Sequence, residues 1–443
     1  MTCDLLIENA AVLTVDPAWN LYEPGFLAVR GDSIAAVGPM AGRRGWDARE
    51  VVDAAGRLLM PGFVNVHTHV AMAAFRGACE DLDDRLRKYI FPMEARLVDR
   101  DLVYRASRFC LTEMAASGTT CFADMYYFED EVARAAREAG LRCVLGETVV
   151  DFPAPDAKEP YGGLEYGLRF ISDWSGDPLV KACLAPHAPY TVDPEHLRAV
   201  RRESEARGLP VLMHIAETTL EHERFSASHG SVLRYLDFEG ALYPGLVGAH
   251  MIYLEPEDIG LAAARGLSVA HCPASNAKGG RPVCPASDLI AAGVPLGLAT
   301  DGPLSGNGMD MQGILGLYPK LQKVRTGNRG AVPAREAVFA ATLGGAEALG
   351  LGSVTGSLEP GKKADMILVD PDSFSMQPVY DWYSAAAYAM RPSDVAATYV
   401  GGRRVWERNR GMRGFDQAEA MADIRRIADR CRGTIAELTG GAP

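Results

Sequence analysis

The sequence predicts an α/β fold, a (β/α)8 TIM barrel with a small β-sandwich domain built from both ends of the chain. Three observations lead to this fold class. From residue 61 onward, short apolar runs alternate with amphipathic stretches, the pattern of parallel strands joined by helices. Several of these stretches end in a glycine directly before the next apolar run, where glycine closes a helix. Strand-like runs without this alternation lie before residue 61 and return after residue 352.

The outer parts of the chain predict the small β unit. The strand-like runs there cover residues 4–16, 25–38, 50–60, 365–369 and 397–403. An amphipathic helical pattern follows from Asp416 to Leu438. We therefore expect three parts: a β domain from residues 1–60 and 353–415, a catalytic barrel over 61–352, and a C-terminal helix within 416–443.

The middle of the chain predicts eight barrel strands. They are Phe63–His67, Thr119–Met125, Arg142–Thr148, Leu179–Ala185, Val211–Ala216, Leu246–Met251, Leu267–His271 and Pro295–Thr300. Helices are expected between them, among them Asp101–Ser117, Glu129–Ala139, Pro194–Arg207, Pro256–Ala264 and Asp288–Ala292. The glycines expected to end helices are Gly118, Gly140, Gly208, Gly266 and Gly293.

Composition narrows the class of protein. The chain has 443 residues, 48% of them hydrophobic and 23% charged, as is typical of a globular protein. A formal charge of −12 without a basic stripe argues against a nucleic acid partner. No apolar stretch has the length of a membrane span, and residues 1–7 do not form a signal peptide. Nine scattered cysteines without a Cys-x-x-Cys pair favour reduced thiols in the cytoplasm. The oligomeric state stays open, with a homo-oligomer as one alternative.

Histidines and carboxylates follow the predicted barrel strands. His67 and His69 come at the end of the first strand, where residues i and i+2 point the same way, so both can reach one metal ion. Further side chains of this kind follow later strands: His187, His214, Glu217, His250 and Asp301. Five of the nine histidines fall at these strand ends, where barrel enzymes place their active residues. His271 ends the seventh strand and is left open as a wall residue, a core histidine or a substrate contact.

These residues lie in motifs that resemble the amidohydrolase superfamily, within it the deaminase and chlorohydrolase branch. The matching pieces are Pro61-Gly62-Phe63-Val64-Asn65-Val66-His67-Thr68-His69, Arg76-Gly77, Glu80-Asp81-Leu82, His214-Ile215-Ala216-Glu217, His250, Pro273-Ala274-Ser275-Asn276, Thr300-Asp301-Gly302 and Leu358-Glu359-Pro360-Gly361. The branch includes methylthioadenosine/S-adenosylhomocysteine deaminases, guanine and cytosine deaminases and s-triazine hydrolases. The ordered set extends from the first strands to about Trp406.

The resemblance implies one metal ion per chain. Its ligands would be His67, His69, His214 and Asp301, with a water completing the shell. A catalytic zinc keeps one position open in this way, and Fe2+ or Mn2+ suits the same ligands. Members with two metals add a bridging lysine at the end of strand four, where this sequence has His187 and no lysine.

The resemblance also implies the catalytic roles. His250 and Asp301 would orient the metal-bound water, and Glu217 would protonate a ring nitrogen of the substrate and pass a proton to the departing amine. Glu94 and His187 match positions that contact substrate in adenosine-type deaminases. The expected reaction is hydrolytic deamination of a small N-heterocycle that is a nucleobase, a nucleoside or a pterin. Among these, a cytosine-type or adenosine-type substrate is favoured.

Two other functions stay open at this stage. One is a triazine-type hydrolase that expels chloride or an alkylamine, and the other is a metal-free barrel that serves as a binding module. Among deaminases, the arginines that hold an amino-acid tail have no counterpart, because Glu147 stands there and residues 148–168 offer only Lys158. We therefore expect free bases or neutral nucleosides to be better substrates than S-adenosylhomocysteine.

Overall fold

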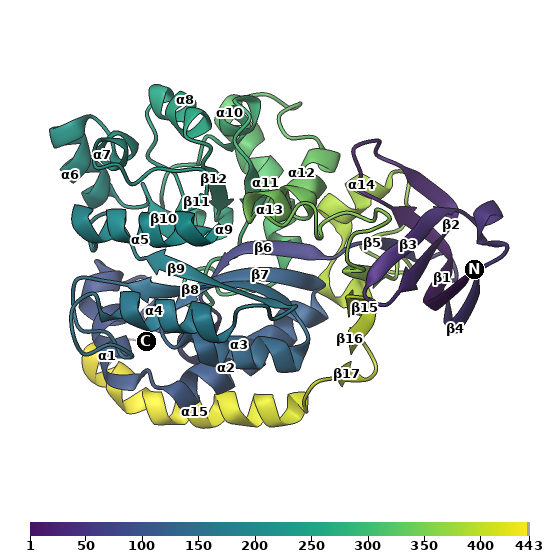
Figure 1. The fold of residues 1–443 in the computed structure, drawn as a ribbon, viewed down its shortest axis with the longest axis horizontal. Coiled ribbons are helices and arrows are strands. Elements are labelled where there is room, and N and C mark those ends of the chain that lie inside the picture. Colours follow the sequence, from purple (N-terminus) through teal and green to yellow (C-terminus); the bar gives the residue numbers. More distant parts are fainter. Residues whose placement is uncertain (441–443) are drawn as a thin grey trace.

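The computed structural model describes residues 1–440 and contains two sheets (Figure 1). The larger has eight parallel strands in chain order: β6 Phe63–Thr68, β7 Thr119–Tyr126, β8 Arg142–Val149, β9 Val180–Pro186, β10 Val211–Ile215, β11 Leu246–His250, β12 Ser268–His271 and β13 Leu296–Leu298. Helices run between these strands and cover the outside of the sheet. The predicted barrel is confirmed.

The two outermost strands of this sheet, β6 and β13, meet through side chains. The Asn65 side chain accepts a hydrogen bond from the Thr300 N–H over 3.1 Å and donates to the Thr300 hydroxyl over 2.8 Å. One residue further, the Asp301 N–H donates to the His67 carbonyl over 3.1 Å. Because buried backbone groups need partners, these bonds replace part of the missing strand ladder and hold His67 beside Asp301.

The predicted helices form at nearly the expected positions. They are α2 Arg100–Ala116, α3 Glu129–Ala139, α5 Pro194–Arg207, α8 Pro256–Ala264 and α10 Ala286–Ala291. The predicted glycines all have positive φ, between +62° at Gly208 and +91° at Gly118, as the left-handed end of a helix requires. Further helices occur between strands: α4 Gly162–Asp173, α6 Thr219–His229, α7 Val232–Phe238, α9 Pro273–Lys278, α11 Met311–Thr326, α12 Ala334–Ala340 and α13 Leu343–Ala348.

The two ends of the chain meet in a nine-stranded mixed sheet, on the right in Figure 1. Its strands are β1 Thr2–Leu13, β2 Leu21–Arg30, β3 Ser33–Pro39, β4 Asp47–Asp53, β5 Leu58–Pro61, β14 Met366–Val369, β15 Val395–Val400, β16 Arg403–Glu407 and β17 Gly411–Met412. Hydrogen bonds connect all of them in one sheet, and Leu27, Met366 and Tyr399 from different parts of it share one core, as in a sandwich.

The sheets join at Gly62, between β5 and β6. A Cβ atom at this position would lie 2.1 Å from the Thr120 side chain, so only glycine allows the approach. Nearby, Arg142 at the start of β8 forms a buried bidentate ion pair with Asp365, over 2.8 and 3.3 Å. We propose that the domain boundary near residue 60 lies at this junction.

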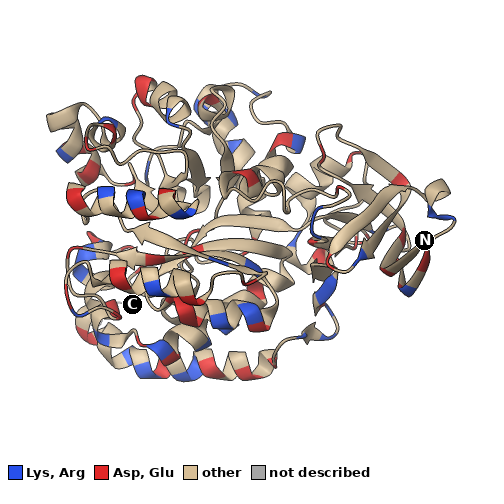
Figure 2. Ribbon diagram, viewed as in Figure 1, with Lys and Arg blue, Asp and Glu red and all other residues tan. Residues whose placement is uncertain are grey.

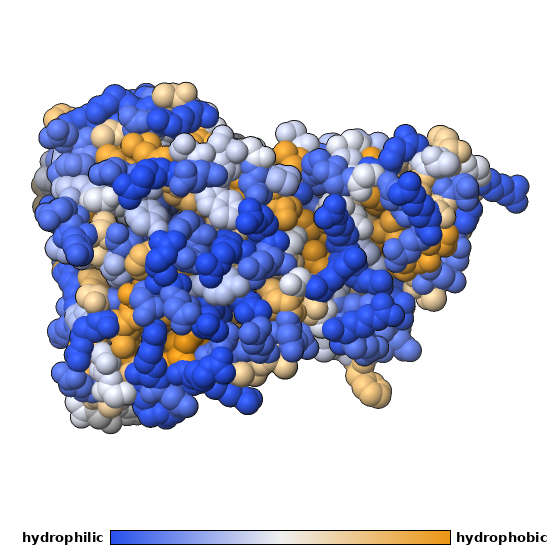
Figure 3. Space-filling view, turned by 60° about the horizontal axis from the view of Figure 1, so that its bottom comes forward, coloured by the Kyte–Doolittle hydropathy of each residue, from blue (hydrophilic) through white to orange (hydrophobic). Residues whose placement is uncertain are grey.

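The C-terminal helix α15, Gln417–Leu438, lies along the barrel against α2 and against α1, Phe91–Leu97. Figure 2 marks its many charged residues by colour, and Asp423 is buried where Arg105 donates to it over 2.9 Å. On the face shown in Figure 3, hydrophilic residues predominate and apolar ones form small separate areas. Within residues 1–440, we find no helix with the length and apolar character to cross a membrane.

Candidate active site

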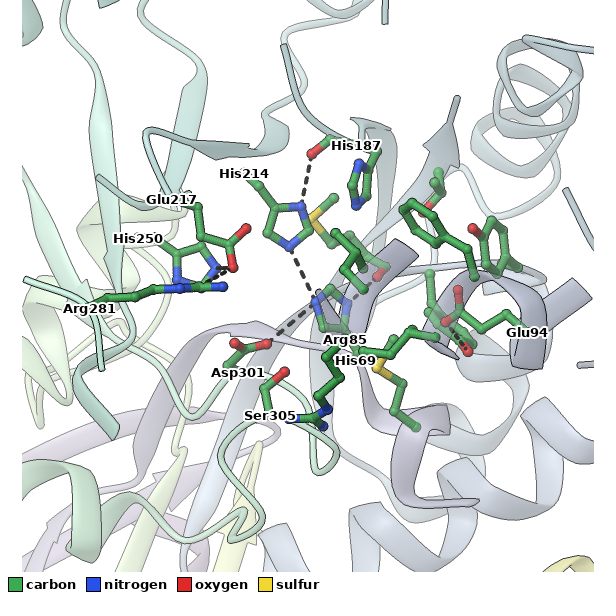
Figure 4. A pocket seen from close by; sticks show the side chains of 18 residues that line it. His69, Arg85, Glu94, His187, His214, Glu217, His250, Arg281, Asp301 and Ser305 are labelled. Carbon is green, nitrogen blue, oxygen red and sulfur yellow. Dashed lines mark hydrogen bonds and ion pairs between the residues drawn. The ribbon is translucent and has the colours of Figure 1, made fainter. Parts of the chain in front are cut away.

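Three histidines and one aspartate meet at the C-terminal end of the barrel, and Figure 4 shows His69, His214 and Asp301 of this group. His67 and His69 come from the end of β6, His214 from β10, and Asp301 follows β13. The Nε2 atoms of His69 and His214 are 3.3 Å apart. Asp301 Oδ1 lies 3.8 Å from His67 Nε2 and 3.5 Å from His69 Nε2. The four side chains predicted as ligands therefore face one small volume.

The histidine rings present their Nε2 atoms to this volume. His69 Nδ1 is hydrogen-bonded to the Met125 carbonyl over 2.6 Å, and His214 Nδ1 to the His187 carbonyl over 2.8 Å. His67 Nε2 is buried and has no hydrogen-bond partner among the described residues. Burial lowers the pKa of His67 well below its usual value and that of His214 to about 4, so these rings are neutral. Imidazoles that are fixed through Nδ1, as those of His69 and His214 are, and that turn Nε2 toward one volume fit a bound metal ion.

Strand ends around the site hold unusual backbone conformations. Ala216, His250 and Asp301 have φ of +52°, +73° and +61°, which side chains other than glycine rarely adopt. The Asp301 carboxylate is fixed there by the Ser275 hydroxyl over 2.6 Å and by the Gly302 N–H over 2.6 Å. Strain of this kind persists where surrounding contacts enforce it, and it gathers at functional sites.

Glu217, His250 and Arg281 form a second group beside the histidines. Glu217 Oε1 accepts from the Arg281 guanidinium and lies 3.6 Å from His250 Nε2, while His250 Nδ1 is hydrogen-bonded to Asn276 Oδ1 over 2.9 Å. Burial by itself would raise the pKa of Glu217, but the neighbouring His250 imidazole and the Arg281 guanidinium hold that pKa below its usual value. Glu217 is therefore a carboxylate in this arrangement.

The backbone of Glu217 is fixed by the helix that follows it. Glu221 accepts from the N–H groups of Ala216 and Glu217, over 3.0 and 2.9 Å, and takes part in the capping box of α6 with Thr218. Sequence reasoning missed this role of Glu221, although Thr218 followed by Glu221 at the third position is the signal of such a box.

A cavity of about 150 Å3 opens from this group and is lined by His187, Glu94, Phe91, Tyr126, Met72 and Arg85 among others. Glu94 comes from α1 and is 3% exposed, and it accepts a hydrogen bond from the Tyr126 hydroxyl over 2.7 Å. Burial raises the pKa of Glu94 to about 8. His187 is held by the Thr191 hydroxyl, 2.8 Å from its Nδ1, beside the ring of Phe91. Both residues line the cavity, and their contact with a substrate stays a prediction.

Comparison with known proteins identifies the family. The family model for the amidohydrolase family matches residues 58–405. The chain belongs to the amidohydrolase family. It is 40% identical over 441 residues to 5-methylthioadenosine/S-adenosylhomocysteine deaminase 1 of Syntrophus aciditrophicus. This match covers 98% of this chain and 99% of the relative. The expected hydrolase acting on non-peptide C–N bonds is confirmed, and the metal-free binding module is set aside.

Solved structures agree with this family. An adenosine deaminase from Xanthomonas campestris with bound zinc superposes with a TM-score of 0.94 at 35% identity, over 98% of this chain and 99% of that one. The atrazine chlorohydrolase of Arthrobacter aurescens TC1 complexed with zinc has a TM-score of 0.88 at 22% identity, over 96% of this chain and 100% of that one. The second likeness shows the shared fold alone.

In this amidohydrolase, some residues singled out in the sequence lie outside the cavity. Glu147 is fully buried and accepts from the Glu129 N–H over 3.0 Å, so Thr148 takes the place beside the cavity. Lys158 is exposed. His271 is buried, lies 5.4 Å from the Tyr318 ring centroid and does not line the cavity, which leaves it a core histidine.

Only one metal centre of this amidohydrolase is evident in the described part of the chain. Two groups of three side chains could hold an ion there, and both contain His67. The second group adds His250 and Cys272, and Cys272 is buried and donates to the Ala270 carbonyl over 3.5 Å. Sequence reasoning gave no cysteine a role, and nothing in the pattern of cysteines could have placed this one beside His67.

Proposed function

We propose that this amidohydrolase binds one zinc ion and hydrolytically deaminates an adenosine-type nucleoside. The ligands are His67, His69, His214 and Asp301. The observation that carries the proposal is the convergence of their donor atoms directly beside the Glu217 carboxylate, at one end of the cavity. Fe2+ and Mn2+ accept the same ligands, so the identity of the metal belongs to the proposal.

When bound, a zinc ion lowers the pKa of its water from about 15.7 to roughly 7 and so supplies a nucleophile at neutral pH. The protein residues then divide the remaining tasks. Asp301 and His250 face the same volume as the ligands and orient the attacking oxygen by hydrogen bonds. The Glu217 carboxylate takes a proton from the attacking water and passes it to the ring nitrogen next to the attacked carbon, which becomes tetrahedral. The second proton of the water goes to the amino group, which leaves as ammonia, and the ring carbon becomes a carbonyl.

The substrate proposal has two supports. The relative from Syntrophus and the structure from Xanthomonas are both named as deaminases of adenosine or its derivatives, at 40% and 35% identity. The cavity also offers a carboxyl group on the wall lined by Tyr126, which suits the two hydroxyls of a ribose. We therefore assign Glu94 to the ribose and His187 to the base or sugar. The sequence alone favoured both free bases and neutral nucleosides. Of these two, we now propose the nucleoside.

A cytosine-type deaminase is the second candidate, because the same residues serve any ring with an amino group beside a ring nitrogen. The alternative of a triazine-type hydrolase is supported only by the shared fold. We also propose a cytoplasmic location, since all nine cysteines are free and buried.

The test is an assay of ammonia release from the zinc-loaded enzyme. Adenosine, 5-methylthioadenosine, cytosine and a pterin are compared with the chlorinated triazine atrazine. We expect the highest kcat/KM for one of the two nucleosides. Release of chloride from atrazine without ammonia from any nucleoside would overturn the proposal.

A further inference from the structure

Arg281 is placed where it can act on Glu217 from outside the barrel strands. It follows α9 after Gly279 and Gly280, and its own N–H donates to the Asn276 carbonyl over 3.0 Å. The side chain turns inward and lines the cavity at its metal end, as Figure 4 shows. Its side chain is 29% exposed, and that of Glu217 is 15% exposed.

The contact divides the two oxygens of Glu217. Oε1 accepts from Arg281 Nη1 and lies 3.6 Å from His250 Nε2. Oε2 has no hydrogen bond to any of the described residues, and it is not among the buried polar atoms. Since Glu217 lines the cavity, Oε2 is the oxygen left open to a bound molecule. A carboxylate held at one oxygen cannot turn freely about its last bond, so its second oxygen keeps one direction.

We infer that Arg281 is a positioning residue for Glu217, one that fixes Oε1 so that Oε2 meets the ring nitrogen of the substrate. This rests on the proposed function, because only there does Glu217 transfer a proton. The guanidinium suits the task since it is always charged and donates in a fixed geometry, which a lysine ammonium does not reproduce. Besides Glu217, the Asp301 carboxylate raises the pKa of Arg281 and so favours the charged guanidinium.

Two other roles are less consistent with the contacts. A contact to the substrate alone would leave the ion pair with Glu217 unexplained, although the other N–H groups of the guanidinium can still reach a bound molecule. As a purely structural residue, it would hold its loop in place, but the loop is already attached through the backbone bond to Asn276. Proton transfer depends on alignment, and a small misplacement of the transferring group is costly.

The test compares Arg281→Ala, Arg281→Lys and wild type, all loaded with zinc, on the best substrate from the ammonia assay. We expect Arg281→Ala to lower kcat by roughly 10–100-fold with KM changed by less than about threefold, because alignment matters in the transition state. Added guanidinium ion should restore part of the rate of Arg281→Ala. The kcat of Arg281→Lys should lie between those of wild type and Arg281→Ala. Arg87→Ala is the matched control, since Arg87 lies near the mouth of the cavity, over the Tyr190 ring, and has no contact with Glu217.

Zinc content and a crystal structure of zinc-loaded Arg281→Ala complete the test. We expect one zinc as in wild type, with the Glu217 side chain rotated or in more than one conformer. An unchanged Glu217 side chain, or a raised KM at unchanged kcat, would overturn the inference. A wild type that releases no ammonia from any nucleoside would instead count against the proposed function, while the crystal structure would still decide the position of Glu217.

Discussion

Tyr126 of β7 donates a hydrogen bond of 2.7 Å to Glu94 of α1, and this contact fixes the acidic wall of the cavity. Burial raises the pKa of Glu94 to about 8, and the Tyr126 bond lowers it only in part. The carboxyl group is therefore mostly protonated at neutral pH in the free protein, and it can both donate to and accept from a sugar hydroxyl.

The protonation of Glu94 predicts a pH dependence of stability. Between pH 4.5 and about 8 the folded protein holds a proton on Glu94 that the unfolded chain has lost, so the free energy of unfolding falls as pH rises through this window. Glu94→Gln removes the cost of burying the charge. Relative to wild type, we expect it to gain stability on the order of 1–3 kcal/mol between pH 5 and pH 9.

Denaturant unfolding at several pH values measures this gain. Glu165→Gln is the control, because Glu165 carries an 82% exposed side chain in a helical pair with Arg169. A constant difference between Glu94→Gln and wild type from pH 5 to pH 9 would show that Glu94 titrates normally.

Glu217→Gln tests the proton transfer. Glutamine keeps the shape of the side chain but cannot exchange a proton, so we expect deamination to fall by roughly 10²–10⁴-fold while the metal stays bound. Glu223→Gln on the exposed face of α6 serves as the control. Near-normal turnover by Glu217→Gln would make Glu217 a structural residue.

Metal analysis tests the assignment of ligands against that of the catalytic histidine. We expect about one zinc per chain in wild type and in His250→Asn, but much less in His214→Asn. The reason is that His214 is a proposed ligand and His250 is not. Removal of the metal by a chelator should abolish ammonia release, and added zinc should restore it. Two tightly bound equivalents per chain would rule out the mononuclear site.

The ion pair of Arg142 and Asp365 predicts a large effect on stability. Both side chains are buried, 7% and 0% exposed, and Asp365 also accepts from the Gly401 N–H over 2.7 Å. Asp365→Ala leaves the guanidinium unpaired, so we expect a loss of about 3–5 kcal/mol in denaturant unfolding. Asp32→Ala breaks a more exposed pair with Lys363 and should cost about 1 kcal/mol or less. Equal losses in the two variants would contradict the importance of burial.

Much of this arrangement was predictable because it follows from local patterns. Strands such as Arg142–Val149 are apolar and are preceded by a helix that ends in glycine, and polar residues at their ends mark the site. Contacts between distant segments were not predictable in the same way. The seam between Asn65 and Thr300, and the pairing of Arg281 with Glu217, join residues 235 and 64 positions apart.

The direction of Glu147 shows the same limit. The sequence has Glu147 where deaminases of large nucleosides have an arginine, and this predicted that the carboxylate of such a substrate would lack a partner. In the structure Glu147 turns away from the cavity, because it caps the Glu129 N–H at the start of α3. Alternation along β8 leaves the neighbouring Thr148 on the cavity side.

The last prediction concerns the size and charge of the substrate. Two arginines line the cavity, and both are engaged: Arg281 donates to Glu217 and Arg85 to the Leu304 carbonyl. Arg76 and Arg169 pair with Glu113 and Glu165 instead. Neither arginine that lines the cavity is therefore without a partner, and an unpaired buried carboxylate of S-adenosylhomocysteine would cost several kcal/mol. A cation at the mouth, Arg87, lies over the Tyr190 ring.

We accordingly expect adenosine and 5-methylthioadenosine to exceed S-adenosylhomocysteine in kcat/KM by at least about tenfold, which corresponds to roughly 1.4 kcal/mol of transition-state stabilisation. Steady-state kinetics of wild type and Arg85→Ala with the three nucleosides provide the measurement. Arg85→Ala should leave the preference for the neutral nucleosides in place, because the carbonyl of Leu304 already occupies Arg85. If S-adenosylhomocysteine were the best substrate and lost its advantage in Arg85→Ala, then Arg85 would bind the carboxylate. The argument from charge would then be wrong, because Arg85 would have given up the neutral Leu304 carbonyl to bind the carboxylate of the substrate.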